Sequence, residues 1–331
     1  MAPKEKEKTA SDYQPIPLHS LRINTVTNFD VYIEVPGPDR KDNFVLYRNR
    51  DIPFLESTRR NLADHGTDTL YIDASDRRQY QLYLEENLEA IIEDEDISPA
   101  EKSKAAYECA AGLVEGLLED PRSGEHVKRS KGFISDLVGY LLNDSRAFFS
   151  LMSSISFDYR TYTHSVNVAV FGIALAHRLE RYTRETINMI GSGLILHDVG
   201  KGLIERDILN KQGSLDTGEW AIMRQHPEEG AKLLRTLGQV SEEALIIVEG
   251  HHERLDGSGY PRGLKGDAIH PYARIAAIAD VFDALTTQRP HRPALSSFAA
   301  LEIMRNEMAE GLDGDLFRTF VLLLGDQSRK V

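Results

Sequence analysis

The chain has 331 residues, of which 41% are hydrophobic and 27% are charged, so it can bury a large core and wholesale disorder is excluded. Its formal net charge of −13 argues against electrostatic binding to nucleic acid polymers or anionic membranes. No apolar stretch reaches the ~20 residues that span a bilayer, and the polar residues 1–12 do not resemble a secretory signal. We therefore expect a cytoplasmic protein that begins with a disordered tail over residues 1–12.

Residues 13–83 mix strand and helix signals. Short β-rich runs lie at residues 31–35, 44–47 and 69–72. The leucine spacing of residues 52–65 predicts a short helix that ends at a glycine. These signals are typical of a small α/β domain. The domain has no recognisable phosphate-binding loop or metal-ligand cluster, so a regulatory or dimerisation role is an interpretation from its position alone.

Residues 84–149 predict a helical connector. Ser98 is a good N-cap, because a proline follows it and Glu101 lies three residues later, and we expect this helix to end near the next proline. A second helix is predicted roughly over residues 126–142. The single cysteine, Cys109, falls within the first of these helices and is interpreted as a buried structural thiol.

Residues 150–331 keep a helical pattern, interrupted by a loop rich in glycine and proline between Arg254 and Pro271. The expected fold class is therefore mainly α, with an all-helical C-terminal domain, a helical connector and a small N-terminal α/β domain. Five of the eleven histidines fall in segments that also hold carboxylates, lysine or turn glycines. These five are His164, His197, His226, His251 and His252.

The pair His197-Asp198 closes an apolar helix. Alone, the pair is explained as well by a hydrogen bond within the core as by a metal site. His164 and Asp280 also lie in strongly apolar helical stretches, where an unpaired imidazole or carboxylate would be costly to bury. A divalent cation is a partner that all four could share. This nitrogen and oxygen donor set suits iron, manganese, nickel or zinc rather than calcium.

A second set of candidate ligands consists of His226, His251 and His252. His226 alone could be a surface residue at a helix start, whereas two adjacent histidines that end an apolar helix cannot both be explained by one hydrogen bond. Asp198 would be free to bridge two metals through its two oxygens. Two metals ~3.5–4 Å apart can activate a bridging hydroxide and neutralise a phosphoryl group. The two sets together therefore predict hydrolysis of a phosphate ester.

Three segments resemble the motifs of the HD-GYP family in their amino-acid sequence and in their order along the chain: residues 197–201 (His-Asp-Val-Gly-Lys), 251–261 and 279–290. The resemblance covers about residues 150–325. It implies a helical HD-superfamily domain that hydrolyses cyclic di-GMP to pGpG, and in some members to GMP, through a metal-bridging hydroxide. It also implies cyclic di-GMP as the ligand, with a homodimer or signalling proteins as further partners.

The resemblance assigns roles to individual residues. The metal ligands would be His164, His197, Asp198, His226, His251, His252 and Asp280. Lys201 would contact the scissile phosphate and act in catalysis with Asp198, the alternative being a surface lysine after a helix stop. Arg289 and Arg292 resemble further phosphate contacts, the alternative being exposed arginines beside prolines. The loop motif comprises Gly259, Tyr260 and Pro261. In the family this loop is linked to the active-site edge and to protein contacts, although a structural turn explains it equally well.

Two departures from the family pattern limit the transfer. Members with a third metal carry a glutamate four residues before the first histidine, where this chain has Arg160, so the expected cofactors are two divalent metal ions, iron or manganese. His291 occupies a place where many relatives have tyrosine, which affects the expected substrate contacts.

Two rival functions stay open from the sequence. One is a metal-binding sensor or interaction module without turnover, although all seven ligands and Lys201 are present. The other is a related HD enzyme that acts on another cyclic dinucleotide or nucleotide, or a di-iron oxygenase on the same scaffold. Lys201 and the complete loop motif favour a phosphodiesterase over an oxygenase, but they do not discriminate among cyclic dinucleotides.

Overall fold

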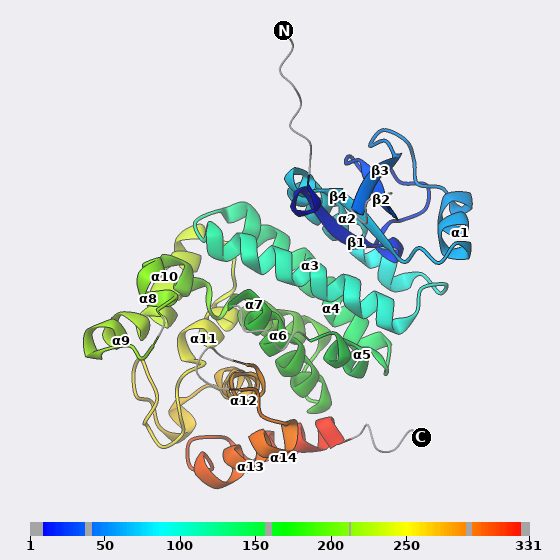
Figure 1. Ribbon diagram of the computed structural model, residues 1–331. Coiled ribbons are helices and arrows are strands. Elements are labelled where there is room, and N and C mark those ends of the chain that lie inside the picture. The colour runs from blue at the N-terminus through cyan, green and yellow to red at the C-terminus, as the bar shows by residue number, and fades with distance from the viewer. Residues whose placement is uncertain (1–8, 37–41, 156–160, 212, 289–292, 326–331) are drawn as a thin grey trace. The chain divides into compact units, whose positions relative to one another are not determined.

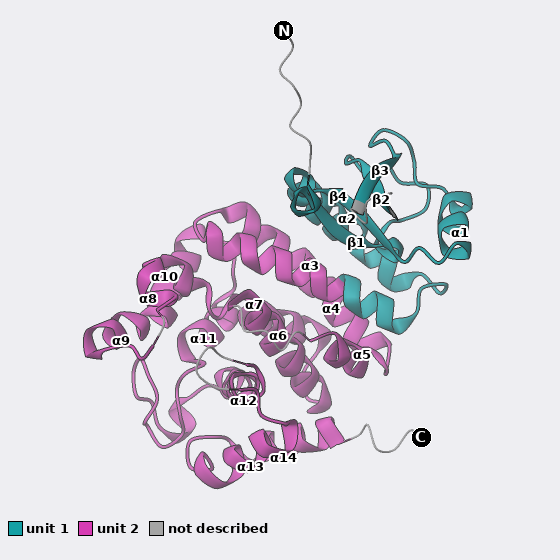
Figure 2. Ribbon diagram, in the orientation of Figure 1, with its two compact units in different colours: residues 1–105 teal, residues 106–331 magenta. Residues whose placement is uncertain are grey.

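A computed structural model of the chain describes residues 9–36, 42–155, 161–211, 213–288 and 293–325 (Figure 1). The chain divides into two compact units, residues 1–105 and residues 106–331, which have different colours in Figure 2. Helix α3 (Pro99–Glu119) contains this division. The predicted domain limits at residues 83 and 149 stay predictions.

The first unit contains a four-stranded antiparallel sheet with the strand order β1-β4-β2-β3. Its strands are β1 (Tyr13–Pro17), β2 (Val31–Pro36), β3 (Asp42–Arg48) and β4 (Thr69–Asp73). The three predicted β-rich runs lie within β2, β3 and β4, so they are confirmed. The sequence pattern does not predict β1, because Pro15 and Pro17 cannot donate to a ladder. They are tolerated because β1 is an edge strand of the sheet.

The helical elements of the first unit are η1 (Ala10–Asp12), η2 (Leu18–Ser20), α1 (Glu56–Asp64), η3 (Ala74–Asp76) and α2 (Arg77–Glu93). Helix α1 begins four residues after the predicted start at Ile52, so that start is wrong. The reason is Pro53, which disfavours helical backbone at the residue before it. Phe54 instead forms a β-bridge with Thr25 and is fully buried.

The second unit is built from helices, and the fold class is mainly α, as predicted. After α3, the α-helices are α4 (Gly124–Asn143), α5 (Ala147–Ser154), α6 (Thr161–Arg178), α7 (Arg184–Leu196), α8 (Arg206–Leu209), α9 (Thr217–Met223), α10 (His226–Leu237), α11 (Glu242–Gly250), α12 (Pro271–Thr286), α13 (Ser297–Glu307) and α14 (Gly314–Gly325). Two 3-10 helices are η4 (Val199–Leu203) and η5 (Gly266–Ala268).

The predicted start of α3 is confirmed by its hydrogen bonds. Glu101 N donates to Ser98 Oγ at 3.3 Å, and Ser98 N donates to the Glu101 carboxylate at 3.0 Å. These are the two reciprocal bonds of a capping box. The second predicted helix corresponds to α4, and Cys109 is a buried free thiol, as expected.

Helix α6 forms the centre of the second unit. Every residue from Thr163 to Ala176 is buried, and α6 packs against α4, α5, α7, α12 and α14. A helix that is covered on all sides is normally apolar all round, so its few polar side chains need partners inside the protein. His164 and Asn167 are two such side chains.

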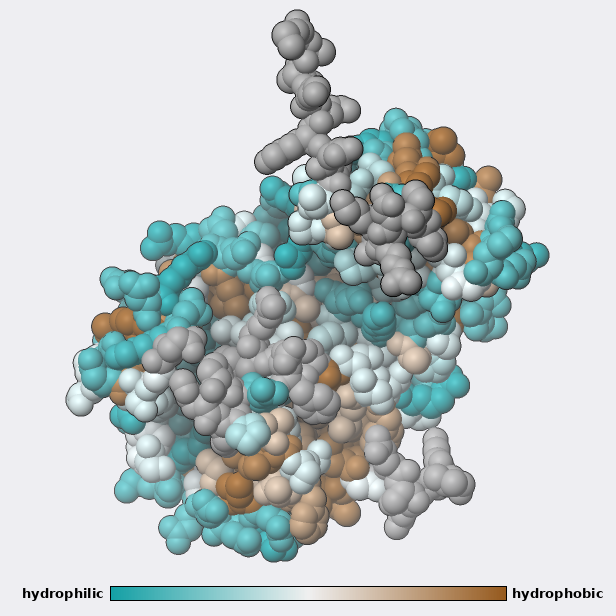
Figure 3. All heavy atoms as spheres, in the orientation of Figure 1, coloured by the Kyte–Doolittle hydropathy of each residue, from teal (hydrophilic) through white to brown (hydrophobic). Residues whose placement is uncertain are grey.

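The visible surface in Figure 3 is mostly hydrophilic, with hydrophobic side chains gathered over the region of α13 and α14. Phe298 and Leu322, from these two helices, are among the exposed large hydrophobic residues. Of the helices in the described ranges, none is both long and apolar enough to cross a bilayer. The expected homodimer or signalling contacts stay predictions.

Candidate metal centre

Three of the predicted ligands lie at helix ends. His197 follows α7, His251 follows α11, and His226 begins α10. Their Nδ1 atoms lie 2.7, 3.0 and 2.8 Å from the carbonyl oxygens of Leu194, Val248 and Met223, respectively. Because a carbonyl oxygen only accepts hydrogen bonds, each Nδ1 carries a proton, so in the neutral form of each ring the lone pair lies on Nε2. The main chain thus prepares three imidazoles for ligation.

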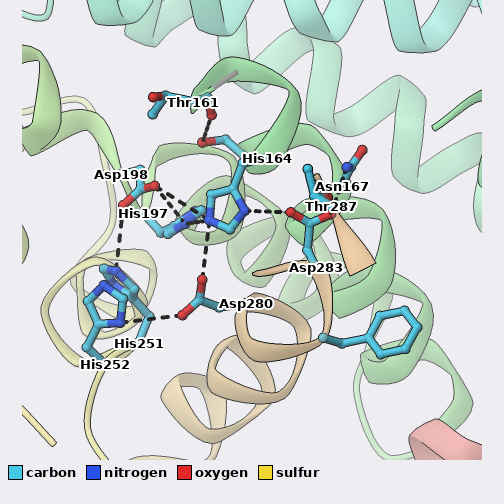
Figure 4. Close-up of polar contacts among 12 residues, drawn as sticks. Thr161, His164, Asn167, His197, Asp198, His251, His252, Asp280, Asp283 and Thr287 are labelled. Carbon is cyan, nitrogen blue, oxygen red and sulfur yellow. Dashed lines mark hydrogen bonds and ion pairs between the residues drawn. The ribbon is translucent and has the colours of Figure 1, made fainter. Parts of the chain in front are cut away.

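His164 and Asp280 approach each other from helices α6 and α12. His164 Nε2 lies 3.2 Å from Asp280 Oδ1, and the other oxygen of Asp280 lies 3.4 Å from His252 Nδ1. Asp280 therefore contacts one histidine from each predicted set. Figure 4 shows the side chains pointing toward one another from separate helices.

The Asp198 carboxylate lies between the two sets and is almost completely buried. Its Oδ2 lies 3.6 and 3.4 Å from Nε2 of His164 and His197. Its Oδ1 lies 3.2 and 3.8 Å from Nε2 of His226 and His251. This is the placement that a bridging carboxylate requires, with one oxygen toward each set.

The ligand atoms form two groups in which all members lie within 4.8 Å of one another. One group consists of His164, His197 and Asp280. The other consists of Asp198, His226, His251 and His252. All seven candidates from the sequence are thus brought together in one cluster, and all are buried except the half-buried His252.

Unpaired acceptors in this cluster indicate that a cation fits. Asp198 Oδ1 is buried and accepts no hydrogen bond from the described part of the chain. Nε2 of His226 lies 3.2 Å from this oxygen and 3.2 Å from Nε2 of His251. When both rings are neutral, three acceptors face one another, an arrangement that is costly to bury without a positive charge. A divalent cation would supply that charge and satisfy all three.

The pKa shifts in the cluster favour metal-ligating protonation states. Burial lowers the pKa of His251 well below its usual range and lowers that of His252 to about 4. Burial raises the pKa of Asp198, but Lys201 and His197 outweigh it and hold that pKa well below the ordinary value. The two histidines are thus neutral and the carboxylate is ionised at neutral pH, as metal binding requires.

His164 differs, because burial lowers its pKa but hydrogen bonds to Asp280 and Asp283 raise it to about 10. The proton on this imidazole partly neutralises the surrounding carboxylates. A divalent cation would take the place of that proton, so metal binding and proton release are linked at this residue.

Lys201 lies beside the bridging carboxylate. It belongs to η4, and its Nζ donates to Asp198 Oδ2 at 2.6 Å. The residue before it, Gly200, packs directly on the first turn of α10, where an added Cβ would lie only 2.0 Å from the His226 carbonyl oxygen. Glycine at this position therefore lets η4 and α10 approach closely enough for Asp198 and His226 to meet.

The predicted loop motif folds back onto the end of the histidine pair. An added Cβ at Gly259 would lie 2.5 Å from the His252 carbonyl oxygen, so the backbones touch there. Tyr260 N donates to that same oxygen at 3.2 Å, and the Tyr260 ring lies 4.5 Å from the His252 ring. The loop therefore forms one edge of the site.

Glu253 supports this loop from within. Its side chain is buried, and its two carboxylate oxygens accept hydrogen bonds from the backbone N–H groups of Arg262 and Leu264, each at 2.8 Å. No role is predicted for Glu253 from the sequence. Its position directly after the histidine pair and before a turn was the available signal.

A cavity of about 910 Å³ opens onto the cluster. Its wall includes Lys201 and four of the candidate ligands, which are His164, His226, His252 and Asp280. The wall also contains three aromatic residues, Tyr162, Trp220 and Tyr260, and three further cationic residues, Arg206, Lys211 and Arg254. This volume lies near the upper end of the range for small-molecule sites, ~300–1,000 Å³.

A group of residues behind His164 is not predicted from the sequence. Asp283 lies 2.7 Å from its Nδ1, and Asn167 and Thr287 donate to the other oxygen of Asp283. The signal was present as spacing, because Asp283 follows Asp280 and Asn167 follows His164 by three residues on the same helices. The predicted phosphate contacts Arg289 and Arg292, together with Arg160 and His291, lie outside the described residues.

Comparison with known proteins identifies the domain. Residues 158–316 match the model of the HD domain family. Cyclic di-GMP phosphodiesterase PA4108 from Pseudomonas aeruginosa is 34% identical over 218 residues, covering 65% of this chain and 52% of that protein. 3′3′-cGAMP-specific phosphodiesterase 2 from Vibrio cholerae is 46% identical over 136 residues, covering 40% of this chain and 25% of that protein. The chain thus spans about half, or less, of these relatives' length.

A solved structure extends the likeness in fold to almost the whole chain. Bd1817, described as an HDG"Y"P protein from Bdellovibrio bacteriovorus, superposes with a TM-score of 0.66 at 21% sequence identity, covering 95% of this chain and 100% of that one. At this identity the likeness concerns the fold alone. Separately from this likeness in fold, the family model matched by residues 158–316 and the cyclic dinucleotide phosphodiesterases among the relatives support an HD domain of the HD-GYP type in the C-terminal part of this chain.

Proposed function

We propose that the chain is a metal-dependent phosphodiesterase that hydrolyses cyclic di-GMP to pGpG, with GMP as the alternative end product. The observation that carries this proposal is the cluster of seven nitrogen and oxygen ligands in two groups, with Asp198 between them, at the wall of a large cavity. Relatives with the names of cyclic di-GMP phosphodiesterases support the choice of substrate.

The cofactors in this proposal are two divalent metal ions, iron or manganese. His164, His197 and Asp280 would hold one ion, His226, His251 and His252 would hold the other, and Asp198 would bridge them. Imidazole and carboxylate donors suit these metals better than calcium. When bound, two such ions supply an activated water and charge neutralisation for phosphoryl transfer.

Lys201 is the proposed phosphate-binding side chain. Its ammonium is already fixed by Asp198 and lines the cavity, so a phosphodiester that enters the site would meet a positioned positive charge. Such a charge stabilises the negative charge that develops on the phosphate oxygens during hydrolysis. We retain Arg289 and Arg292 as further proposed phosphate contacts.

The aromatic residues of the cavity wall suit a ligand with purine bases. Trp220 is about half exposed, and the guanidinium of Arg224 lies 6.0 Å from its ring and 5.4 Å from the Tyr260 ring. Both rings are thus linked through one cation. Every nucleobase has a π-face that can stack on an aromatic side chain. We therefore propose that Trp220 and Tyr260 contact the bases.

A second candidate substrate is 3′3′-cGAMP. The observation in its favour is the 46% identity to a Vibrio cholerae phosphodiesterase whose name specifies that dinucleotide. The two substrates differ in one purine base, so the same metal groups and Lys201 would serve both. The proposed location of the enzyme is the cytoplasm, where such second messengers act.

The deciding experiment measures turnover of the full chain purified without air. Metal-free protein is reloaded with Mn²⁺ or Fe²⁺, given cyclic di-GMP or 3′3′-cGAMP, and the products are separated by chromatography. Hydrolysis of cyclic di-GMP with either metal supports the proposal. If neither dinucleotide is hydrolysed with Mn²⁺ or with Fe²⁺, the proposal is overturned and a metal-binding sensor module is favoured.

Two variants separate metal binding from phosphate binding. Asp198→Ala should lose metal and turnover together. Lys201→Ala should keep both metals but lose about 10²- to 10³-fold in kcat, as expected when one charge-stabilising donor is removed. Lys232→Ala, at an exposed lysine of α10, is the matched control and should leave turnover unchanged. A Lys201→Ala variant with full kcat would refute the role proposed for this side chain.

A further inference from the structure

His164 is oriented differently from three of the other candidate histidine ligands. His197, His226 and His251 direct Nδ1 toward backbone carbonyls, whereas His164 directs Nδ1 toward the side chain of Asp283 at 2.7 Å. A backbone carbonyl is fixed by the helix to which it belongs. The orientation of His164 therefore depends on how firmly the Asp283 side chain is held.

Asp283 is itself held on both oxygens. Its Oδ2 accepts from His164, and its Oδ1 accepts from Asn167 Nδ2 at 2.7 Å and from Thr287 Oγ1 at 3.1 Å. The Asp283 carboxylate is 1% exposed, so water does not compete for these bonds. Figure 4 shows Asn167 and Thr287 on the side of Asp283 that faces away from the metal cluster.

The chain of hydrogen bonds continues to helix α3. Because a carboxylate only accepts, the amide of Asn167 must direct Nδ2 toward Asp283, which leaves Oδ1 on its other side. That oxygen accepts from the Tyr107 hydroxyl at 2.9 Å. Tyr107 and Asn167 are both buried. Three side chains from three helices, α3, α6 and α12, thus stand behind one ligand.

We propose that Tyr107, Asn167 and Asp283 are positioning residues that hold His164 with Nε2 toward the cluster of candidate ligands. They determine metal occupancy at the group of His164, His197 and Asp280, and they leave the second group largely unaffected. The inference rests on the proposed metal centre, but not on turnover of any dinucleotide. Partners of this kind fix the tautomer and ring direction of a ligating histidine, and their loss costs metal affinity.

The test uses Co²⁺, whose visible absorption reports the number and geometry of its ligands. Metal-free full-length protein is titrated with Co²⁺ in the absence of air, and the metal content is measured after buffer exchange. The wild type should bind two equivalents. Asp283→Asn and Asn167→Leu should bind one equivalent as tightly as the wild type and the other about 10- to 100-fold more weakly.

Two further variants identify the affected group and guard against misfolding. The spectrum of Asp283→Asn with one equivalent bound should match that of His164→Ala, which removes the ligand itself. Tyr107→Phe deletes only a hydroxyl and should weaken the same equivalent to a smaller extent. Tyr140→Phe is the matched control, because Tyr140 is a buried tyrosine of α4 that bonds to neither Asn167 nor Asp283, and its titration should match that of the wild type.

The outcomes are distinct. Two equivalents with wild-type affinity and spectrum in Asp283→Asn, Asn167→Leu and Tyr107→Phe would overturn the inference. Equal weakening of both equivalents in Tyr107→Phe would also overturn it, because the effect would then not be selective for one group. A wild-type protein that binds no Co²⁺ would instead refute the proposed metal centre. Absence of dinucleotide hydrolysis alone would refute only the proposed activity.

Discussion

Gly200 offers a sharp test of how closely the fold must pack to assemble the site. In Gly200→Ala, the new methyl group would lie 2.0 Å from the His226 carbonyl oxygen and 2.9 Å from the backbone nitrogen of Gly230. Both neighbours are main-chain atoms, so no side-chain rotation relieves the clash. Since real Cβ contacts essentially never fall below 3.0 Å, η4 and α10 must separate by about 1 Å (3.0 − 2.0).

That separation acts directly on the candidate metal centre. His226 is the first residue of α10, and its Nε2 lies 3.2 Å from Asp198 Oδ1. A displacement of about 1 Å can lower a catalytic rate about 10²-fold, and overpacking costs ~1–3 kcal/mol of stability. We therefore expect Gly200→Ala to lose metal from the group that contains His226 and to lose most turnover.

The assay combines metal content after anaerobic loading, turnover of cyclic di-GMP and denaturant unfolding. Gly132→Ala is the matched control, because Gly132 lies within helix α4 and an added Cβ there meets nothing within 4 Å. That change should stabilise the protein by ~0.4–1 kcal/mol. If Gly200→Ala binds as much metal as the wild type and is equally stable, the close approach of η4 and α10 is not required to assemble the site.

Three further predictions concern the cavity, the loop and the metals. Trp220→Ala should raise KM for a cyclic dinucleotide about tenfold, since loss of base stacking costs ~1–3 kcal/mol, while the control Ile222→Ala should leave KM unchanged. A Trp220→Ala variant with the KM of the wild type would exclude stacking on this side chain. Glu253→Ala should speed amide hydrogen exchange at Arg262 and Leu264, because their N–H groups lose an acceptor, and unchanged protection would contradict this support. Removal of metal by a chelator should lower the melting temperature, since a ligand at 100 times its Kd stabilises by ~2.7 kcal/mol; an unchanged value would argue against metal binding to the folded state.

The elements that the sequence predicts well are those with local signals. The capping box at Ser98 and the apolar periodicity after it define α3, and alternation defines β2. Strand β1 has no such signal, because its two prolines are typical of a loop and its partner β4 is distant in the sequence, as in the pairing of Tyr13 with Asp73, 60 residues later (73 − 13). Only the non-local pairing makes this segment a strand.

The residues of the candidate site likewise differ in whether a local sequence signal predicts them. Imidazoles and carboxylates in apolar helices are visible in the sequence because they are costly to bury, so six of the seven candidate ligands, all except His226, stand out in this way. Their assignment as ligands remains a prediction that metal analysis tests. Tyr107 and Asn167 could not be found this way, because a buried tyrosine or asparagine has many explanations and their contact joins residues 60 positions apart.

The backbone carbonyls that orient His197, His226 and His251 also bear on how such a site can change over evolutionary time. Any side chain that fits at Leu194, Met223 or Val248 leaves the carbonyl oxygen in place, so these positions can drift independently. His164 has no such freedom, because its partner, and that partner's own partners, are side chains on other helices. Substitutions behind His164 should therefore become fixed in concert, while the supports of the other three histidines accumulate replacements one at a time.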